Sequence, residues 1–297
     1  MRLSAPELIL DTQAFLGEGP TWDAARQQLY WVDIIAGHLH CFDPGSRQDQ
    51  IIDVGQPLGC AAPTRSGRLI LGLQNSLAIL DPTNSHITNI MYPESHLPGN
   101  RFNDGKCGPD GRFLVGSMDN AEVDASGSLY SLASDGTLQT LLSGIGISNG
   151  LTWSPDRTIM YFIDTPTRQV MAYDYDLASG DIANPRAVVS VPAEMGWPDG
   201  MTSDSNGYLW VALWGGAALS VWNPKNGALV EKIAIPAKNV TSCVFGGPRL
   251  DQLFITTARK GLDSADLAAF PASGGLFRVL TDVTGSPTFV YADVYPA

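Results

Sequence analysis

A turn and an apolar, β-prone run follow one another in Pro155-Asp156-Arg157-Thr158-Ile159-Met160-Tyr161-Phe162-Ile163. The chain repeats this pairing, with further turns at Ser66-Gly67-Arg68, Asp110-Gly111-Arg112 and Asn206-Gly207-Tyr208. Turns of this composition join antiparallel strands. Six apolar runs begin at residues 29, 69, 113, 160, 209 and 253, so that successive starts lie 40, 44, 47, 49 and 44 residues apart.

This spacing predicts the fold. Repeats of about 40 to 50 residues with about four strands each are typical of β-propeller blades, and six of them account for nearly the whole chain. We therefore expect an all-β protein, one domain over residues 1–297, folded as a six-bladed β-propeller with four antiparallel strands per blade. We expect the segment 7–11 to close the ring by pairing with 288–294. The alternative is two β-sandwiches, which would need a linker and have no reason to repeat at this period.

The composition narrows the function classes. The 297 residues include 30 Asp and Glu against 18 Lys and Arg, a formal charge of −12. Such a chain repels phosphate backbones and anionic membranes on average, so nucleic acid and membranes are poor partners. The N-terminal residues do not read as a signal peptide, and the four cysteines form no Cys-x-x-Cys pair. We expect a cytoplasmic monomer with reduced thiols.

Counting back from the repeated runs finds polar residues at equivalent positions. Glu18 and Asn149 lie 11 residues before their runs, and Asn103 and Asp199 lie 10 residues before theirs. Equivalent positions near the inner strands of a propeller surround one central channel. The count therefore predicts that these four side chains converge. Three of them precede a glycine, which permits a close approach of backbones near the axis.

Two carboxylates and two amides predict a central metal site. Their hard oxygen atoms suit Ca²⁺, Mg²⁺ or Mn²⁺. The set is not selective for Zn²⁺ but does not exclude it, so Zn²⁺ is also a candidate ion. The alternative interpretation is that Asn-Gly and Asp-Gly are ordinary turn dipeptides, but their recurrence at one repeat position weakens it. The third repeat is ambiguous. If the repeats are aligned on the glycine that follows the polar residue, Asp104, which precedes Gly105, takes the place of Asn103.

The sequence also resembles a known family, the regucalcin, gluconolactonase and luciferin-regenerating group of six-bladed propellers. The resemblance is carried by Leu16-Gly17-Glu18-Gly19-Pro20, Arg101-Phe102-Asn103-Asp104-Gly105-Lys106, Ile147-Ser148-Asn149-Gly150-Leu151, Pro198-Asp199-Gly200-Met201, Thr241-Ser242-Cys243-Val244-Phe245-Gly246-Gly247 and Ala258-Arg259-Lys260-Gly261-Leu262. It implies that Glu18, Asn149 and Asp199 hold one divalent cation, and that Arg101 and Asn103 contact a sugar lactone.

One segment departs from the family pattern. Animal members carry paired glutamates after a Gly-Thr-Met motif, whereas here Gly116-Ser117-Met118 continues as Asp119-Asn120-Ala121-Glu122. We expect Asp119 or Asn120 to hold the sugar hydroxyls instead.

These observations predict metal-dependent hydrolysis of a sugar lactone, such as gluconolactone or a pentonolactone, to the aldonic acid. The cation would polarise the carbonyl and activate water, Asp199 would act as the general base, and Arg101 would orient the substrate. A phosphotriesterase-like hydrolase and a non-catalytic calcium-binding propeller are the alternatives.

The remaining aromatic residues and histidines suggest structural roles. Trp31, Trp153, Trp210 and Trp222 are expected to pack within blades, and Trp197, two residues before Asp199, is expected to form a wall of the pocket. The four histidines are expected at the surface, and no Gly-x-Ser-x-Gly elbow is present.

Overall fold

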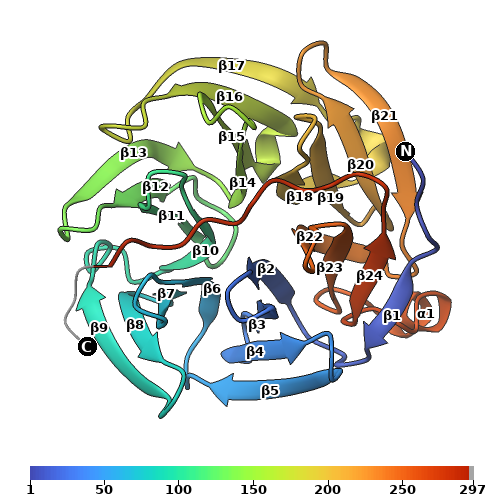
Figure 1. The fold of residues 1–297 in the computed structure, drawn as a ribbon, viewed down its shortest axis with the longest axis horizontal. Helices are drawn as coiled ribbons and strands as arrows, with labels where there is room; N and C mark the ends of the chain where they lie inside the picture. Colours follow the sequence, from blue (N-terminus) through green and yellow to red (C-terminus); the bar gives the residue numbers. More distant parts are fainter. Residues whose placement is uncertain (294–297) are drawn as a thin grey trace.

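Six four-stranded antiparallel sheets surround a central axis in the computed structural model, which describes residues 1–293 (Figure 1). This arrangement confirms the predicted six-bladed β-propeller. In five of the sheets the strands follow one another in chain order from the axis outward. The six apolar runs that define the repeat form the second strand of each blade.

The strands of the first three blades have these bounds: β2 (Gly17–Asp23), β3 (Gln28–Asp33), β4 (His38–Asp43) and β5 (Gln48–Asp53); β6 (Leu58–Pro63), β7 (Leu69–Leu73), β8 (Leu77–Asp81) and β9 (His86–Met91); β10 (Asn100–Cys107), β11 (Phe113–Asp119), β12 (Gly127–Leu132) and β13 (Leu138–Ile145). The last three comprise β14 (Ser148–Trp153), β15 (Ile159–Asp164), β16 (Gln169–Tyr175) and β17 (Ile182–Ser190); β18 (Trp197–Ser203), β19 (Leu209–Trp214), β20 (Ala218–Asn223) and β21 (Ala228–Ala234); β22 (Asn239–Gly246), β23 (Gln252–Ala258), β24 (Leu276–Leu280) and β1 (Glu7–Leu10). Short helical turns lie at Thr165–Thr167 and Ala193–Met195, and α1 spans Ser264–Ala269.

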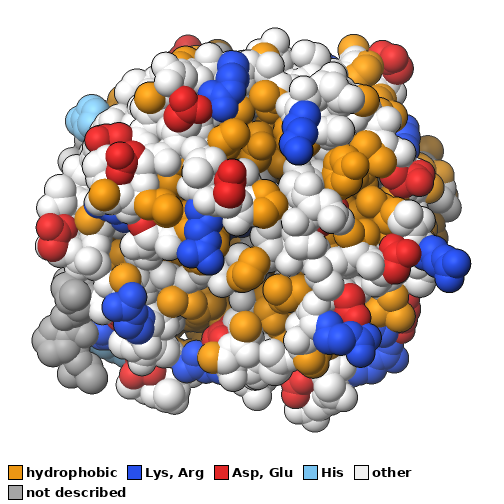
Figure 2. Space-filling model, turned by 45° about the horizontal axis from the view of Figure 1, so that its top comes forward, with side chains coloured by type: hydrophobic (Ala, Val, Ile, Leu, Met, Phe, Trp, Pro, Cys, Tyr) orange, Lys and Arg blue, Asp and Glu red, His pale blue; other side chains and the backbone are white. Residues whose placement is uncertain are grey.

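The apolar core lies between the blades. Six clusters of buried side chains occur in the described part of the chain, one between each pair of neighbouring blades. Inner strands such as β2 are buried along their whole length, whereas outer strands such as β5 are mostly exposed. Each sheet therefore buries both faces near the axis and meets solvent at its outer edge. The surface in Figure 2 mixes charges of both signs with scattered apolar side chains.

The chain closes the ring through β1 and β24, not through the segment 288–294. Glu7 pairs with Arg278 and Leu10 with Leu276, so the last blade takes three strands from one end of the sequence and its outer strand from the other. The expectation for 288–294 was wrong because β24 already occupies the edge that β1 pairs with, while Tyr291 bridges to Thr64 in the second blade. Residue 294 lies outside the described residues.

Residues 281–293, which we call the strap, cross the face of the propeller from β24 toward β9 (Figure 1). The strap forms single bridges with Asp204 through Gly285 and with Thr64 through Tyr291. The Tyr291 side chain is fully buried, and its hydroxyl donates to the carbonyl of Ala133 at 2.9 Å. The strap thus ties together blades that are distant in sequence.

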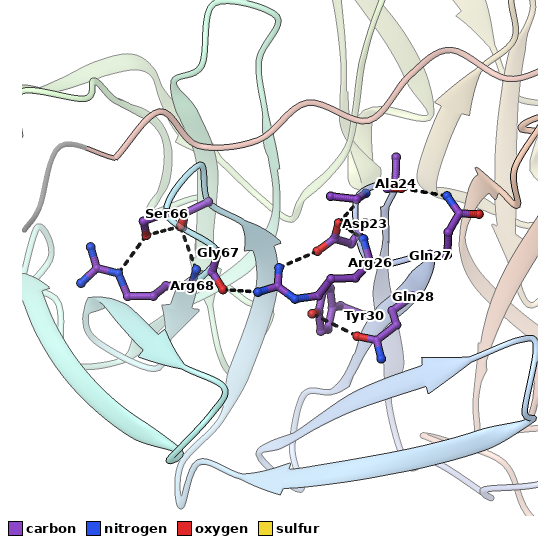
Figure 3. A network of polar contacts seen from close by, with 11 residues as sticks. Asp23, Ala24, Arg26, Gln27, Gln28, Tyr30, Ser66, Gly67 and Arg68 are labelled. Atoms are coloured by element: carbon purple, nitrogen blue, oxygen red, sulfur yellow. Dashed lines mark hydrogen bonds and ion pairs between the residues drawn. The ribbon is translucent and has the colours of Figure 1, made fainter. Parts of the chain in front are cut away.

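Polar contacts also join neighbouring blades at this end of the strands. Arg26, in the β2–β3 turn, donates to Asp23 at 3.0 Å and to the Gly67 carbonyl of the next blade at 2.7 Å (Figure 3). The turns that define the repeat therefore also make contacts between blades. Within residues 1–293, no helix has the length and apolar character needed to cross a bilayer.

The four tryptophans expected in blade packing are buried, with exposed fractions of 4% or less. The surface position expected for the histidines was wrong for His40, which is buried in β4. Its ring stacks on Trp31, with centroids 3.7 Å apart, and its Nδ1 lies 2.6 Å from a carboxylate oxygen of Asp49. Both partners stand on neighbouring strands, so the local sequence did not reveal them.

Candidate metal centre

A bulge interrupts every inner strand at the same height. The pairing register shifts between Glu18 and Thr21 in β2, Leu58 and Cys60 in β6, Phe102 and Gly105 in β10, Asn149 and Leu151 in β14, Pro198 and Met201 in β18, and Val240 and Ser242 in β22. A bulge adds one residue to a strand and redirects its side chains. Six bulges at one level therefore let inner strands aim polar side chains at the axis.

The four residues found by counting line one cavity. Glu18, Asn103, Asn149 and Asp199 are each buried and lie at the floor of a space of about 350 Å³. The cavity opens where inner strands begin and second strands end, whereas the strap covers the turns at the other end of these strands. A Cβ added at Gly150 would lie 2.8 Å from the carbonyl oxygen of Asp199. This contact confirms the close backbone approach expected for a glycine after Asn149.

The carboxyl groups of Glu18 and Asp199 both line the cavity and influence each other's pKa. Burial raises the pKa of both carboxyl groups. Repulsion by Asp104 raises the pKa of Glu18 further, and repulsion by Glu18 raises that of Asp199. The Gly19 amide opposes this shift by donating to Glu18 at 2.8 Å. Two neighbouring buried acids must retain a proton or gain a cation.

The two asparagines at the floor differ in their contacts. Asn149 donates its Nδ2 to Thr165 Oγ1 at 2.8 Å, and the threonine donates to the Pro198 carbonyl at 2.8 Å. This chain orients the Asn149 amide, whose oxygen accepts one long hydrogen bond, from Asn103 Nδ2 at 3.2 Å, and keeps a second lone pair for a ligand. Asn103 donates to the Ser148 carbonyl at 2.8 Å, and its own oxygen accepts from Arg101 at 2.5 Å. Asn149 is therefore the better placed oxygen ligand of the two.

The ambiguity between Asn103 and Asp104 is resolved by the cavity, which Asn103 lines and Asp104 does not. Asp104 is buried and accepts from the Gly105 amide at 2.8 Å. The half-buried Lys106 provides an opposing charge, which counteracts the raising of the Asp104 pKa by burial, and donates to the Met201 carbonyl at 2.9 Å. Within residues 1–293 no three His, Cys, Asp or Glu side chains come together as a metal site, so a metal held here would need amide oxygen as well as Glu18 and Asp199.

Arg101 lines the cavity next to this floor and is only 3% exposed. Burial lowers its pKa to about 10, while the charges of Glu122, Glu18 and Asp199 act in the opposite direction. Its Nε donates to Asn120 at 3.2 Å, and its Nη1 donates to Asn103 and to the Phe102 carbonyl. The guanidinium is thus held in place at the cavity.

The two residues expected to hold sugar hydroxyls do not line the cavity. The Asp119 carboxylate accepts from the backbone amides of Ala121, Val123 and Asp124, so it shapes its own loop. Asn120 contacts Arg101 and reaches the cavity only through it. Substrate binding by these two residues stays a prediction.

Sequence reasoning missed an ion pair at the cavity mouth. Lys260 lies between blades 6 and 1 and contacts Glu122, which belongs to the loop after β11, although 138 residues separate them in sequence. Glu122 stood beside the residues singled out for the substrate, but no local signal points to its partner. The wall expected of Trp197 is confirmed, since this side chain lines the cavity.

The fold and this floor together define a class: a six-bladed propeller with an acidic site at the centre of one face. The chain belongs to the family described as the SMP-30/Gluconolactonase/LRE-like region, whose family model matches residues 16–259.

Its relatives resemble it along nearly the whole chain. A Bacillus subtilis protein provisionally named sugar lactone lactonase YvrE is 38% identical over 275 residues, covering 93% of this chain and 94% of that protein. A solved luciferin-regenerating enzyme superposes with a TM-score of 0.91 at 33% identity, over 98% of this chain and 99% of the other. Regucalcin from Agrobacterium tumefaciens, described as a calcium-binding protein, has a TM-score of 0.92 at 28% identity, over 97% of each chain.

Proposed function

We propose that this protein hydrolyses a sugar lactone to the aldonic acid with one divalent cation held by Glu18, Asn149 and Asp199. Membership of the gluconolactonase-like family and a lactonase-named relative support a hydrolase of lactones. The observation that carries the proposal is the convergence of two buried carboxyl groups at the floor of an open cavity. Two carboxylates and an amide oxygen suit a hard divalent cation.

A divalent cation bound at this floor would supply a Lewis acid that polarises the lactone carbonyl. Among the described residues, no Ser, Cys or His side chain lines the cavity. The Thr165 hydroxyl does line it, but this hydroxyl accepts from Asn149 and donates to the Pro198 carbonyl. Water is therefore the attacking group. A carboxylate oxygen of Asp199 accepts the proton that this water loses.

Arg101 orients the substrate in this scheme. Its guanidinium is fixed by Asn103 and Asn120, so it does not need to be ordered when the substrate arrives. It donates to a ring hydroxyl of the lactone or to the carboxylate that forms as the ring opens.

The test is turnover by the chelated protein after single metals are added back. Gluconolactone and a pentonolactone are followed by proton release, with spontaneous ring opening subtracted at each pH. We expect no turnover after chelation and recovery to different extents with Ca²⁺, Mn²⁺, Mg²⁺ and Zn²⁺, because open oxygen sites discriminate weakly among metals.

Two results would contradict the proposal. Cleavage of a phosphotriester while every lactone stays at background would favour the phosphotriesterase alternative. Tight calcium binding without turnover of either substrate would favour a non-catalytic binding propeller.

A further inference from the structure

The wall above the polar floor is largely apolar. It is formed by side chains from blade 1, from the junction of blades 3 and 4, and from blade 5, namely Leu16, Ile34, Met118, Ile147, Trp197 and Trp214. Two single bridges fix parts of this wall, Leu16 with Ala258 and Met118 with Ile147. The cavity of about 350 Å³ lies in the range of about 300 to 1,000 Å³ typical of small-molecule pockets.

Two tryptophans dominate the blade 5 side of the wall. Trp197 and Trp214 are direct partners across β18 and β19. Trp197 is 41% exposed, and the Arg168 guanidinium lies 3.5 Å from the centre of its ring. Arg168 also donates to the Gly196 carbonyl at 2.8 Å. This cation–π contact and hydrogen bond hold one indole face while leaving part of the ring to solvent.

Apart from the floor residues and Arg101, the polar side chains that line the cavity already have protein partners. Thr165 both donates and accepts within the protein. Lys260 and Glu122 are paired with each other. Asp119 does not line the cavity and is occupied by backbone amides. Hydroxyls held against the apolar side chains of the wall, out of reach of Arg101, would lack protein partners, which is costly.

Three exposed apolar residues neighbour cavity-lining residues in the sequence. Phe15 is 48% exposed and Val123 is 80% exposed, and each adjoins a residue that lines the cavity. Ile35, next to the lining residue Ile34, is 42% exposed.

Resting on the proposed function, we propose that the preferred substrate is a lactone whose ring carries an apolar arm, a methyl or longer alkyl group, in place of a hydroxylated one. The lactone carbonyl lies at the floor, and the arm packs against Trp197 and Trp214. Hydrolysis breaks the bond between the carbonyl carbon and the ring oxygen, and water oxygen bonds to that carbon. One water proton ends on the former ring oxygen, and the new carboxylic acid releases the other.

The first test compares an aldono-1,4-lactone with its terminal deoxy analogue, which differs by one hydroxyl. An apolar pocket discriminates against an added hydroxyl by up to about 100-fold, so we expect kcat/KM to be about 10- to 100-fold higher for the deoxy compound. In γ-lactones with methyl, propyl and pentyl arms, kcat/KM should rise about fourfold for each added methylene that reaches the wall.

Variants assign the effect to the wall. In Trp197→Ala the ratio between pentyl and methyl lactones should fall to less than a third of its wild-type value. Tyr92→Ala, which removes a side chain that is 55% exposed and does not line the cavity, should leave the ratio unchanged. Unfolding temperatures of both variants check that the fold is retained. An equal loss in both variants would overturn the assignment.

A binding measurement separates this inference from the proposed function. Calorimetry compares cyclopentanone with 2-pentylcyclopentanone, neither of which can be hydrolysed, on the calcium-loaded protein. Tighter binding of the pentyl compound supports the apolar arm even if no lactone is turned over, in which case only the proposed function fails. Turnover of the hydroxylated lactone at equal or higher kcat/KM, with equal binding of the two ketones, overturns the inference and leaves the proposed function standing.

Discussion

Replacement of Asp199 by Asn removes one carboxylate from the cavity floor and keeps the size of the side chain. We expect this variant to lose the stabilisation that a divalent cation gives the wild type. A ligand at 100 times its Kd adds about 2.7 kcal/mol to the free energy of unfolding. With about 2.1 cal/mol/K of unfolding entropy per residue, a chain of 297 residues should gain about 4 °C in Tm.

The metal-free proteins should behave in the opposite way. The raised pKa of Glu18, about 8, means that its carboxylate form is disfavoured by burial and by neighbouring acids. Removing the charge of Asp199 relieves part of this repulsion, so the chelated variant should be at least as stable as the chelated wild type.

Thermal melts with and without Ca²⁺ measure both effects. Asp124→Asn, which removes an exposed carboxylate from the loop after β11, is the matched control and should keep the metal-induced gain of the wild type. A gain of about 4 °C that persists in Asp199→Asn would refute the assignment of this residue as a ligand. So would an equal loss in the control.

Three further predictions concern the substrate, pH and the strap. Arg101→Ala should lower kcat/KM by about 10- to 100-fold while calorimetry finds the cation affinity unchanged; metal loss would show a structural role. Because the pKa of Glu18 is raised, the metal-free protein should lose stability as pH rises from about 5 to 8, and cation affinity should increase over the same range as the competing proton leaves; a flat profile in both would contradict this. Asp293→Asn should reduce the free energy of unfolding by about 1 to 3 kcal/mol. Burial raises the pKa of Asp293, but hydrogen bonds from Ser66 and Arg68 outweigh it and lower the pKa, so the difference in melts should be full at neutral pH and fade as pH falls through this lowered value.

The floor of the cavity could be predicted because the blades repeat. Counting back from the apolar runs placed four side chains at one level. Glu18 and Asn149 lie 11 residues before the start of their runs, whereas Asn103 and Asp199 lie 10 residues before theirs. The bulges explain this difference: Glu18 and Asn149 pair with the second strand, whereas Asn103 and Asp199 stand within the register shift. The ambiguity between Asn103 and Asp104 has the same cause, because a count along the sequence contains no information on where a strand bulges.

Contacts between distant segments were not predictable in this way. The pairing of Lys260 with Glu122 depends on how two loops meet across the cavity mouth. The burial of His40 depends on Trp31 and Asp49 from adjacent strands. Lys, Glu, His and Asp are ordinary surface types, and their partners are set by the packing of loops and strands and not by the local sequence.

The last blade also constrains how the protein is made. Residues 7–10 are synthesised first but pair with residues 276–280, and at about 5 to 20 residues per second the interval is on the order of tens of seconds. Throughout translation the growing chain therefore presents unpaired strand edges, which favour association with other chains. Glu18 stands on the first blade and Asp199 on the fifth, so a cation held by both could be loaded only after the fifth blade has been made.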